Sequence, residues 1–170
     1  MKKVIYIWNR LYYGFFFYHS WSQILFYKIF WVIPISFLCD LGILNKKKYS
    51  RLSIEVARSL TDEKISTVVL ISDATILAFT ALIVWTIANF LSLLIPRLSL
   101  VFLNRSSVIL ITSILVMPIN YFILWKKNRY LEYFKKFHNS TPLRNWIWSI
   151  ISISAMLFAL LLFILSWHLM

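Results

Sequence analysis

Three long runs without a formally charged residue constrain this sequence more than any other feature. They extend over 74–96, 106–125 and 145–170, where only His168 could carry a charge. A hydrocarbon core about 30 Å thick requires about 20 residues of helix. Hydrophobic residues make up 61% of the chain and charged residues only 14%, so too few polar side chains exist to cover a soluble core. We therefore expect each run to form a transmembrane helix.

A fourth span is expected nearer the N-terminus, where Lys28 interrupts an apolar stretch and Asp40 ends it. The predicted fold class is an all-α integral membrane protein, with four transmembrane helices in a left-handed antiparallel bundle that forms a single membrane domain. The predicted segments are an interfacial or re-entrant arm over 1–20, a span at 22–44, a basic cytoplasmic loop over 46–64, spans at 66–96 and 98–125, a basic and aromatic cytoplasmic loop over 126–144, and a span at 146–169.

The first 20 residues are unusually aromatic: nine of the sixteen residues from Tyr6 to Trp21 carry an aromatic ring. At 100° per residue, Val4, Trp8, Leu11 and Phe15 share one face, which predicts an amphipathic interfacial helix lying on the membrane. This helix is either an anchor that continues into the first span or an arm that binds lipid or a partner. Its bases favour anionic cytoplasmic lipid, which an external N-terminus allows only if residues 1–44 form a re-entrant hairpin.

The distribution of basic residues predicts the orientation. Twelve of the 18 Lys and Arg residues lie in the segments 46–64 and 126–144. Because short loops rich in Lys and Arg stay in the cytoplasm, both loops are predicted to be cytoplasmic. With four spans, the N- and C-termini are then extracytoplasmic, in a cell (inner or plasma) membrane.

Small and polar residues recur at intervals that suit helix packing. In the second span Ala74, Ala78, Ala81 and Ala88 follow a period of about 3.5 residues, and in the third span Ser106, Ser113 and Asn120 are seven apart. Such stripes predict packing seams between helices. The alternative is a pore or cavity lined by the serines and Asn120, which would require several copies of the chain around one axis.

Two acidic residues fall inside predicted spans, where a charge is costly. Asp73 and Asp40 each lie a few residues from the cytoplasmic end of their helix, so antiparallel packing predicts similar depths. They are candidates for a shared ion or proton site. The alternative is that each forms a buried salt bridge with a nearby base or reaches interfacial water.

No pattern in the sequence indicates catalytic, cofactor-binding or metal-binding residues. The three histidines are widely separated, Cys39 is the only cysteine, and Gly-rich loops and hydrolase motifs are missing. We therefore predict no cofactor and consider an enzyme the less favoured class.

The cytoplasmic segments are candidates for contact with anionic lipid headgroups or with an acidic cytoplasmic protein, whereas direct nucleic-acid binding is disfavoured because topology explains most of the charge. The leading hypothesis is a non-enzymatic, homo-oligomeric membrane subunit that acts as an anchor, sensor or channel-like component for a cytoplasmic partner. The alternative is a small ion or solute transporter, or a membrane enzyme, that uses Asp73 and Asp40. The contact candidates are Lys46, Lys47, Lys48, Lys126, Lys127, Arg129, Lys135 and Lys136.

Overall fold

The computed structural model describes residues 2–43, 45–60, 62, 66–95 and 105–169, and among these it leaves the side chains of 46, 48, 52, 57, 58, 60 and 105–109 undescribed. Every regular element in this part of the chain is a helix. Four helices are long and apolar enough to cross a membrane, which confirms the predicted all-α, multi-pass class. The left-handed twist of the bundle stays a prediction.

The first helix is much longer than expected. α1 (Lys2–Tyr27) passes through a π-helical turn, η1 (Lys28–Val32), into α2 (Ile33–Asp40), which gives 39 continuous helical residues. At 1.5 Å per residue this helix is about 60 Å long, roughly twice the hydrocarbon thickness. The segments predicted as an arm over 1–20 and a span at 22–44 thus lie on one continuous helix, as the alternative of an anchor that continues into the first span expects. The interfacial position of the arm stays a prediction.

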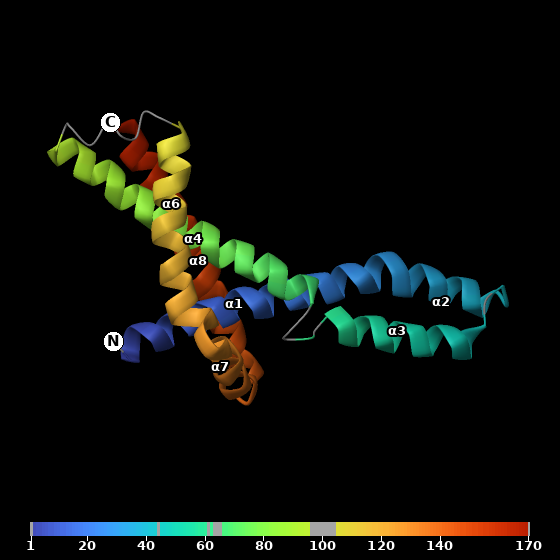
Figure 1. Ribbon diagram of the computed structural model, residues 1–170. Coiled ribbons are helices and arrows are strands. Elements are labelled where there is room, and N and C mark those ends of the chain that lie inside the picture. The colour runs from blue at the N-terminus through green and yellow to red at the C-terminus, as the bar shows by residue number, and fades with distance from the viewer. Residues whose placement is uncertain (1, 44, 61, 63–65, 96–104, 170) are drawn as a thin grey trace.

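α3 (Lys46–Leu60) turns back along α2, so that the two form a hairpin extending away from the other helices (Figure 1). The turn uses Gly42, whose φ of 76° is a left-handed conformation that glycine adopts without a steric penalty. The segment predicted as a basic loop over 46–64 is thus helical for most of its length.

The other long helices form a second unit. α4 (Thr67–Leu94) packs against both α6 (Arg105–Asn120) and α8 (Pro142–His168). The N-terminus of α4 is capped by Ser66, whose hydroxyl accepts a hydrogen bond from the Val69 amide at 3.3 Å. α4 and α8 end near each other, as Figure 1 shows, and Asn89 and Ser166 are hydrogen-bonded at that end.

The segment after α6 bends sharply. Pro118 removes one amide donor inside α6, and a π-helical turn, η2 (Tyr121–Trp125), follows within three residues. In the short helix η3 (Lys126–Asn128), Lys127 and Asn128 both have positive φ, at 59° and 53°. Arg129 donates to the Phe122 carbonyl at 2.8 Å, which satisfies an acceptor that the bend exposes. The chain then continues as α7 (Arg129–His138) in a new direction.

The core lies where α1 meets α7. Tyr130, Phe134 and Phe137 recur on one face of α7 and are buried. Their rings contact buried rings of α1: Tyr130 contacts Tyr12, Phe137 contacts Tyr13, and Phe134 contacts both Tyr13 and Phe16. The Phe134 ring centroid is 5.0 Å from that of Tyr13 and 4.9 Å from that of Phe16. These are normal distances for favourable ring contacts. The two aromatic segments that the sequence assigns to separate surfaces therefore pack against each other.

Candidate functional site

α1 crosses the α4–α6–α8 unit at one end. Its hydrogen bonds and ring contacts reach residues 73–79 near the start of α4, residues 120–125 after α6, and residues 145–152 near the start of α8. The opposite end of α8, near Ser166, contacts α4 instead. The N-terminal third of α1 thus lies beside α7, and the C-terminal end of α8 lies at the far end of the unit (Figure 1).

Asp73 joins three helical segments. Its Oδ1 accepts a 2.5 Å hydrogen bond from the Tyr12 hydroxyl and a 3.1 Å bond from the Trp125 indole. Tyr12 is completely buried, and Asp73 is half-buried. Both donors are neutral, so these contacts hold the carboxylate without a salt bridge. The arrangement ties α1 and η2 to the first turns of α4.

Asp40 does not share this site. It ends α2, about 40 Å beyond Tyr12 along the same continuous helix at 1.5 Å per residue. The predicted equal depth assumed that the first helix packs against α4 over its whole length. Because only the first half of that helix packs there, the structure does not bring the two candidate residues, Asp73 and Asp40, together within the chain.

Arg10 is the most unusual buried residue. Its side chain is 1% exposed, and Nη2 donates to Asn145 Oδ1 at 3.0 Å. The guanidinium carbon lies 4.4 Å from the ring centroid of Phe137, with the rings of Tyr13 and Trp148 at 5.5 and 5.6 Å. Nε and Nη1 are buried and have no hydrogen-bond partner in the described part of the chain. Aromatic faces therefore provide much of the stabilisation of this cation.

The amphipathic pattern of residues 1–20 places Arg10 on the polar face of the helix and does not predict its burial. A signal was present, because Arg10 is surrounded in sequence by rings and followed four residues later by Gly14, one of only two glycines. Gly14 lets α8 approach so closely that Ser149 donates to the Gly14 carbonyl and Ser152 to the Leu11 carbonyl, each at 3.0 Å. That close approach buries Arg10 against Asn145.

Two further polar contacts fasten the helices. Asn120 is fully buried, donates to Thr80 Oγ1 at 2.9 Å and accepts from the Trp8 indole at 3.2 Å. At the other end of the unit, Asn89 donates to Ser166 at 3.0 Å. In a membrane such contacts each contribute about 0.6 kcal/mol to helix association.

The two predicted stripes of small and polar residues, on α4 and on α6, differ in how far they are buried. Ala74 and Ala78 are exposed and Ala81 and Ala88 are partly exposed, because the buried face of α4 is formed by larger or more polar residues. This buried face comprises Val68, Val69, Ser72, Ile76, Phe79, Thr80, Thr86, Asn89 and Ser92. Ser113 is exposed whereas Asn120, seven residues later, is buried, and the side chain of Ser106 lies outside the described residues. Of the described members of these two stripes, Ala74, Ala78 and Ser113 therefore lie outside the packing seams, whereas Asn120 lies within one.

The predicted basic contacts lie mainly on outward-facing surfaces. Lys126, Lys127, Lys135 and Lys136 are exposed, as is Lys47 on α3, while the side chains of Lys46 and Lys48 lie outside the described residues. Arg129 is half-buried by its bond to the Phe122 carbonyl. The Lys126 ammonium lies 5.0 Å from the Phe122 ring, and the Lys136 ammonium 5.8 Å from the Tyr6 ring.

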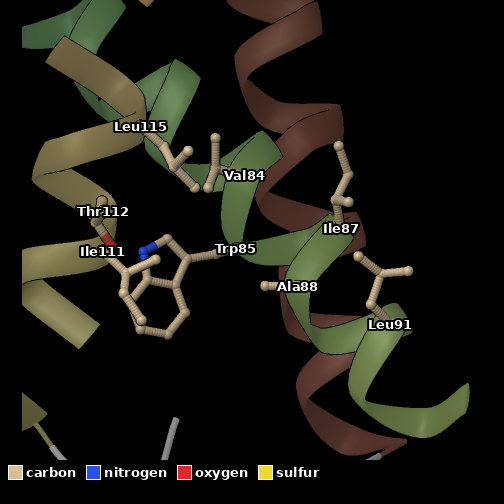
Figure 2. A pocket seen from close by; sticks show the side chains of 8 residues that line it. All are labelled: Val84, Trp85, Ile87, Ala88, Leu91, Ile111, Thr112 and Leu115. Carbon is tan, nitrogen blue, oxygen red and sulfur yellow. The ribbon is translucent and has the colours of Figure 1, made fainter. Parts of the chain in front are cut away.

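An apolar pocket of about 290 Å³ lies between α4 and α6. Figure 2 shows the Trp85 indole pointing from α4 toward Ile111 and Thr112 of α6. The described side chains that line it are all uncharged, so this lining suits a hydrocarbon group. The lining residues are Val84, Trp85, Ile87, Ala88, Leu91, Ile111, Thr112 and Leu115.

Within the described residues, no group of three His, Cys, Asp or Glu side chains is placed to hold a metal ion. Two of the polar clusters that the structure assembles, around Asp73 and around Arg10, include residues of α1. No family model, curated protein or solved structure matches this chain.

Proposed function

We propose that this protein is a non-enzymatic membrane subunit in which α4, α6 and α8 span the bilayer and hold the α1–α2–α3 segment along its cytoplasmic surface. The observation that carries this proposal is the position of α1, whose described hydrogen bonds to α4 and α8 lie at one end of the α4–α6–α8 unit. A helix that crossed the membrane with the others would contact them from end to end. The sequence-based expectation of an interfacial N-terminal helix is thereby extended to α2 and α3.

The charge distribution supports the same arrangement. With α1, α3 and α7 on one surface, fifteen basic residues of the described part of the chain lie on that side, and Arg105 lies on the other. The positive-inside rule assigns this surface to the cytoplasm. The N-terminus is then cytoplasmic and the C-terminus extracytoplasmic, which replaces the four-span orientation and removes the conflict over Lys2, Lys3 and Arg10.

The α2–α3 hairpin is the part that we propose binds a cytoplasmic partner. It extends beyond the other helices in Figure 1, and its second helix carries five basic residues, including Lys47 and Arg51, against the single acid Glu55. Charge complementarity therefore favours an acidic protein. Exposed Ala74 and Ala78 on α4 support the association of several copies, since small side chains let a second helix approach closely.

The membrane placement is tested by single cysteines in a Cys39→Ser background, labelled by a membrane-impermeant maleimide from either side. We expect Val4→Cys, Ile54→Cys and Asn139→Cys to react from the cytoplasmic side and Leu169→Cys from the opposite side. All four positions are exposed in the structure. Labelling of positions 4 and 169 from the same side would contradict the proposal and restore the four-span orientation.

Partner binding is tested by charge reversal on α3. Lys47→Glu combined with Arg51→Glu should abolish co-purification of an acidic partner that the parent chain retains in mild detergent, because attraction becomes repulsion. Both side chains are exposed, so the membrane yield should not change. The matched control, Lys126→Glu with Lys127→Glu, removes equal charge away from the hairpin. Equal retention by the two double variants would refute the assignment to α3.

A second candidate function is ion or proton transport through Asp73, favoured by a carboxylate that two neutral donors hold inside a candidate span. Both donors bond to Oδ1, and Asn at position 73 retains an acceptor oxygen there. We therefore expect Asp73→Asn to preserve assembly and yield. In proteoliposomes, loss of a flux that the parent protein shows, with assembly intact, would favour the transporter over the subunit.

A further inference from the structure

A cavity of about 400 Å³ lies between the start of α1 and the outer face of α7. Of the six described residues that line it, three are lysines: Lys2 and Lys3 from α1 and Lys136 from α7. Tyr6 and Tyr133 also line it, and their ring centroids are 6.2 Å apart. Residues that are far apart in the chain thus form one basic cavity with phenolic groups in its wall.

Further positive charge lies behind the cavity wall. The Tyr6 ring centroid is 5.5 Å from that of Phe137, and the Arg10 guanidinium lies on the Phe137 ring at 4.4 Å. Arg10 is therefore about one aromatic layer from the cavity, within the Debye length of about 8 Å to 10 Å at moderate salt. The first amides of α1 add the positive end of its helix dipole. The acidic residue nearest in sequence to the cavity residues is Glu132, which directly precedes Tyr133, and it does not line the cavity.

The cavity also has an apolar edge. Ile7 lines it and is 48% exposed, and Val4, one turn earlier on α1, is 57% exposed. A soluble anion would leave these apolar side chains exposed to water, whereas the acyl chain of a lipid whose headgroup is bound in the cavity would cover them. The lysines and the apolar edge together favour a lipid over a soluble anion. This inference rests on the proposed placement of α1 and α7 at the cytoplasmic surface.

We propose that the cavity formed by Lys2, Lys3, Tyr6, Ile7, Tyr133 and Lys136 binds the phosphate headgroup of an anionic phospholipid from the cytoplasmic leaflet. The ammonium groups pair with phosphate oxygens, and the tyrosine hydroxyls donate hydrogen bonds to the headgroup. Ile7 and Val4 contact the first part of an acyl chain. Bound in this way, the lipid joins α1 to α7 at the surface and fixes the start of the long helix.

The test measures lipid retained by the full-length protein in detergent, by native mass spectrometry, as phosphatidylglycerol is titrated against phosphatidylcholine. The cavity variant combines Lys2→Gln, Lys3→Gln and Lys136→Gln. Since each lysine contributes about fivefold to anionic-lipid affinity, we expect retention about 100-fold weaker. The control combines Lys126→Gln, Lys127→Gln and Lys135→Gln, which removes the same charge outside the cavity and should keep affinity within about threefold of the parent.

Two further arms identify the source of the phosphate. Inorganic phosphate and the deacylated headgroup glycerophosphoglycerol should each compete at least about 100-fold more weakly than the intact lipid. Equal competition would overturn the lipid assignment in favour of a free-anion site. Equal loss in the cavity and control variants would show diffuse surface attraction and overturn the cavity. Helical content by circular dichroism should match the parent in both variants. Cysteine labelling reports the membrane placement separately, so failure of the cavity and failure of the topology are distinguishable.

Discussion

Gly14→Val should destabilise the protein by about 3 kcal/mol, because α1 and α8 touch at this residue. A Cβ atom at position 14 would lie 2.7 Å from the Trp148 carbonyl oxygen and would overlap the Ser152 hydroxyl. Separating the helices to make room would also break the 3.0 Å bonds from Ser149 to Gly14 and from Ser152 to Leu11. The rings that cover Arg10 would lose contact as a further consequence.

Gly14→Ala separates packing from helix propensity. Alanine in place of glycine stabilises a helix interior by about 1 kcal/mol, so a neutral site would gain stability. At position 14 we expect a net loss of about 2 kcal/mol, because the packing cost of about 3 kcal/mol exceeds that gain. The free energy of unfolding in mixed detergent and denaturant measures both substitutions. A gain in stability for Gly14→Ala would contradict the close approach of α1 and α8.

Gly42→Ala is the matched control, since these are the only two glycines in the chain. A Cβ at Gly42 meets nothing within 4 Å, but φ is 76°. The expected cost is about 1 kcal/mol, from the left-handed backbone alone. Unlike Gly14→Val, this substitution should leave proteolytic protection of the α1–α8 contact unchanged.

The apolar spans could be predicted because their signal is local: a run of about 20 uncharged residues has few alternatives in any fold. The path that α1 takes through the structure could not be predicted from the sequence. Its aromatic face predicts burial against something apolar, and lipid satisfies that requirement as well as Tyr130, Phe134 and Phe137 of α7 do. Only the tertiary structure distinguishes these two environments, because a sequence pattern specifies which face is buried and not what covers it.

The same reasoning explains the packing stripes. A period of 3.5 residues in Ala74, Ala78 and Ala81 identifies a face that permits close approach, yet lipid or a second copy can occupy it equally well. The faces used within the chain carry Asp73, Thr80 and Asn120 instead, because their hydrogen bonds reach partners on other helices. In a hydrocarbon environment a polar group gains from such a partner, whereas an alanine has no comparable requirement.

Arg10→Ala should lower stability by about 3 kcal/mol, while Arg10→Met should stay within about 1 kcal/mol of the parent. Alanine leaves a void among Phe137, Tyr13 and Trp148, whereas methionine fills it with a side chain of similar length. Methionine loses a cation–π contact of about 2 kcal/mol and the bond to Asn145, but it removes two buried donors without partners, Nε and Nη1.

The cost of Arg10→Met depends on whether Asn145, the hydrogen-bond partner of Arg10, keeps another donor. Its Oδ1 also accepts a 2.8 Å hydrogen bond from the Ser140 hydroxyl, which the Phe137 carbonyl shares, so this oxygen keeps one donor when the guanidinium is removed. The loss is then confined to Arg10 itself, and its unpaired donors offset most of it. Unfolding free energies of the two variants, measured beside the parent, check the prediction. If Arg10→Met were as destabilised as Arg10→Ala, the positive charge rather than the volume of Arg10 would hold α1, α7 and α8 together.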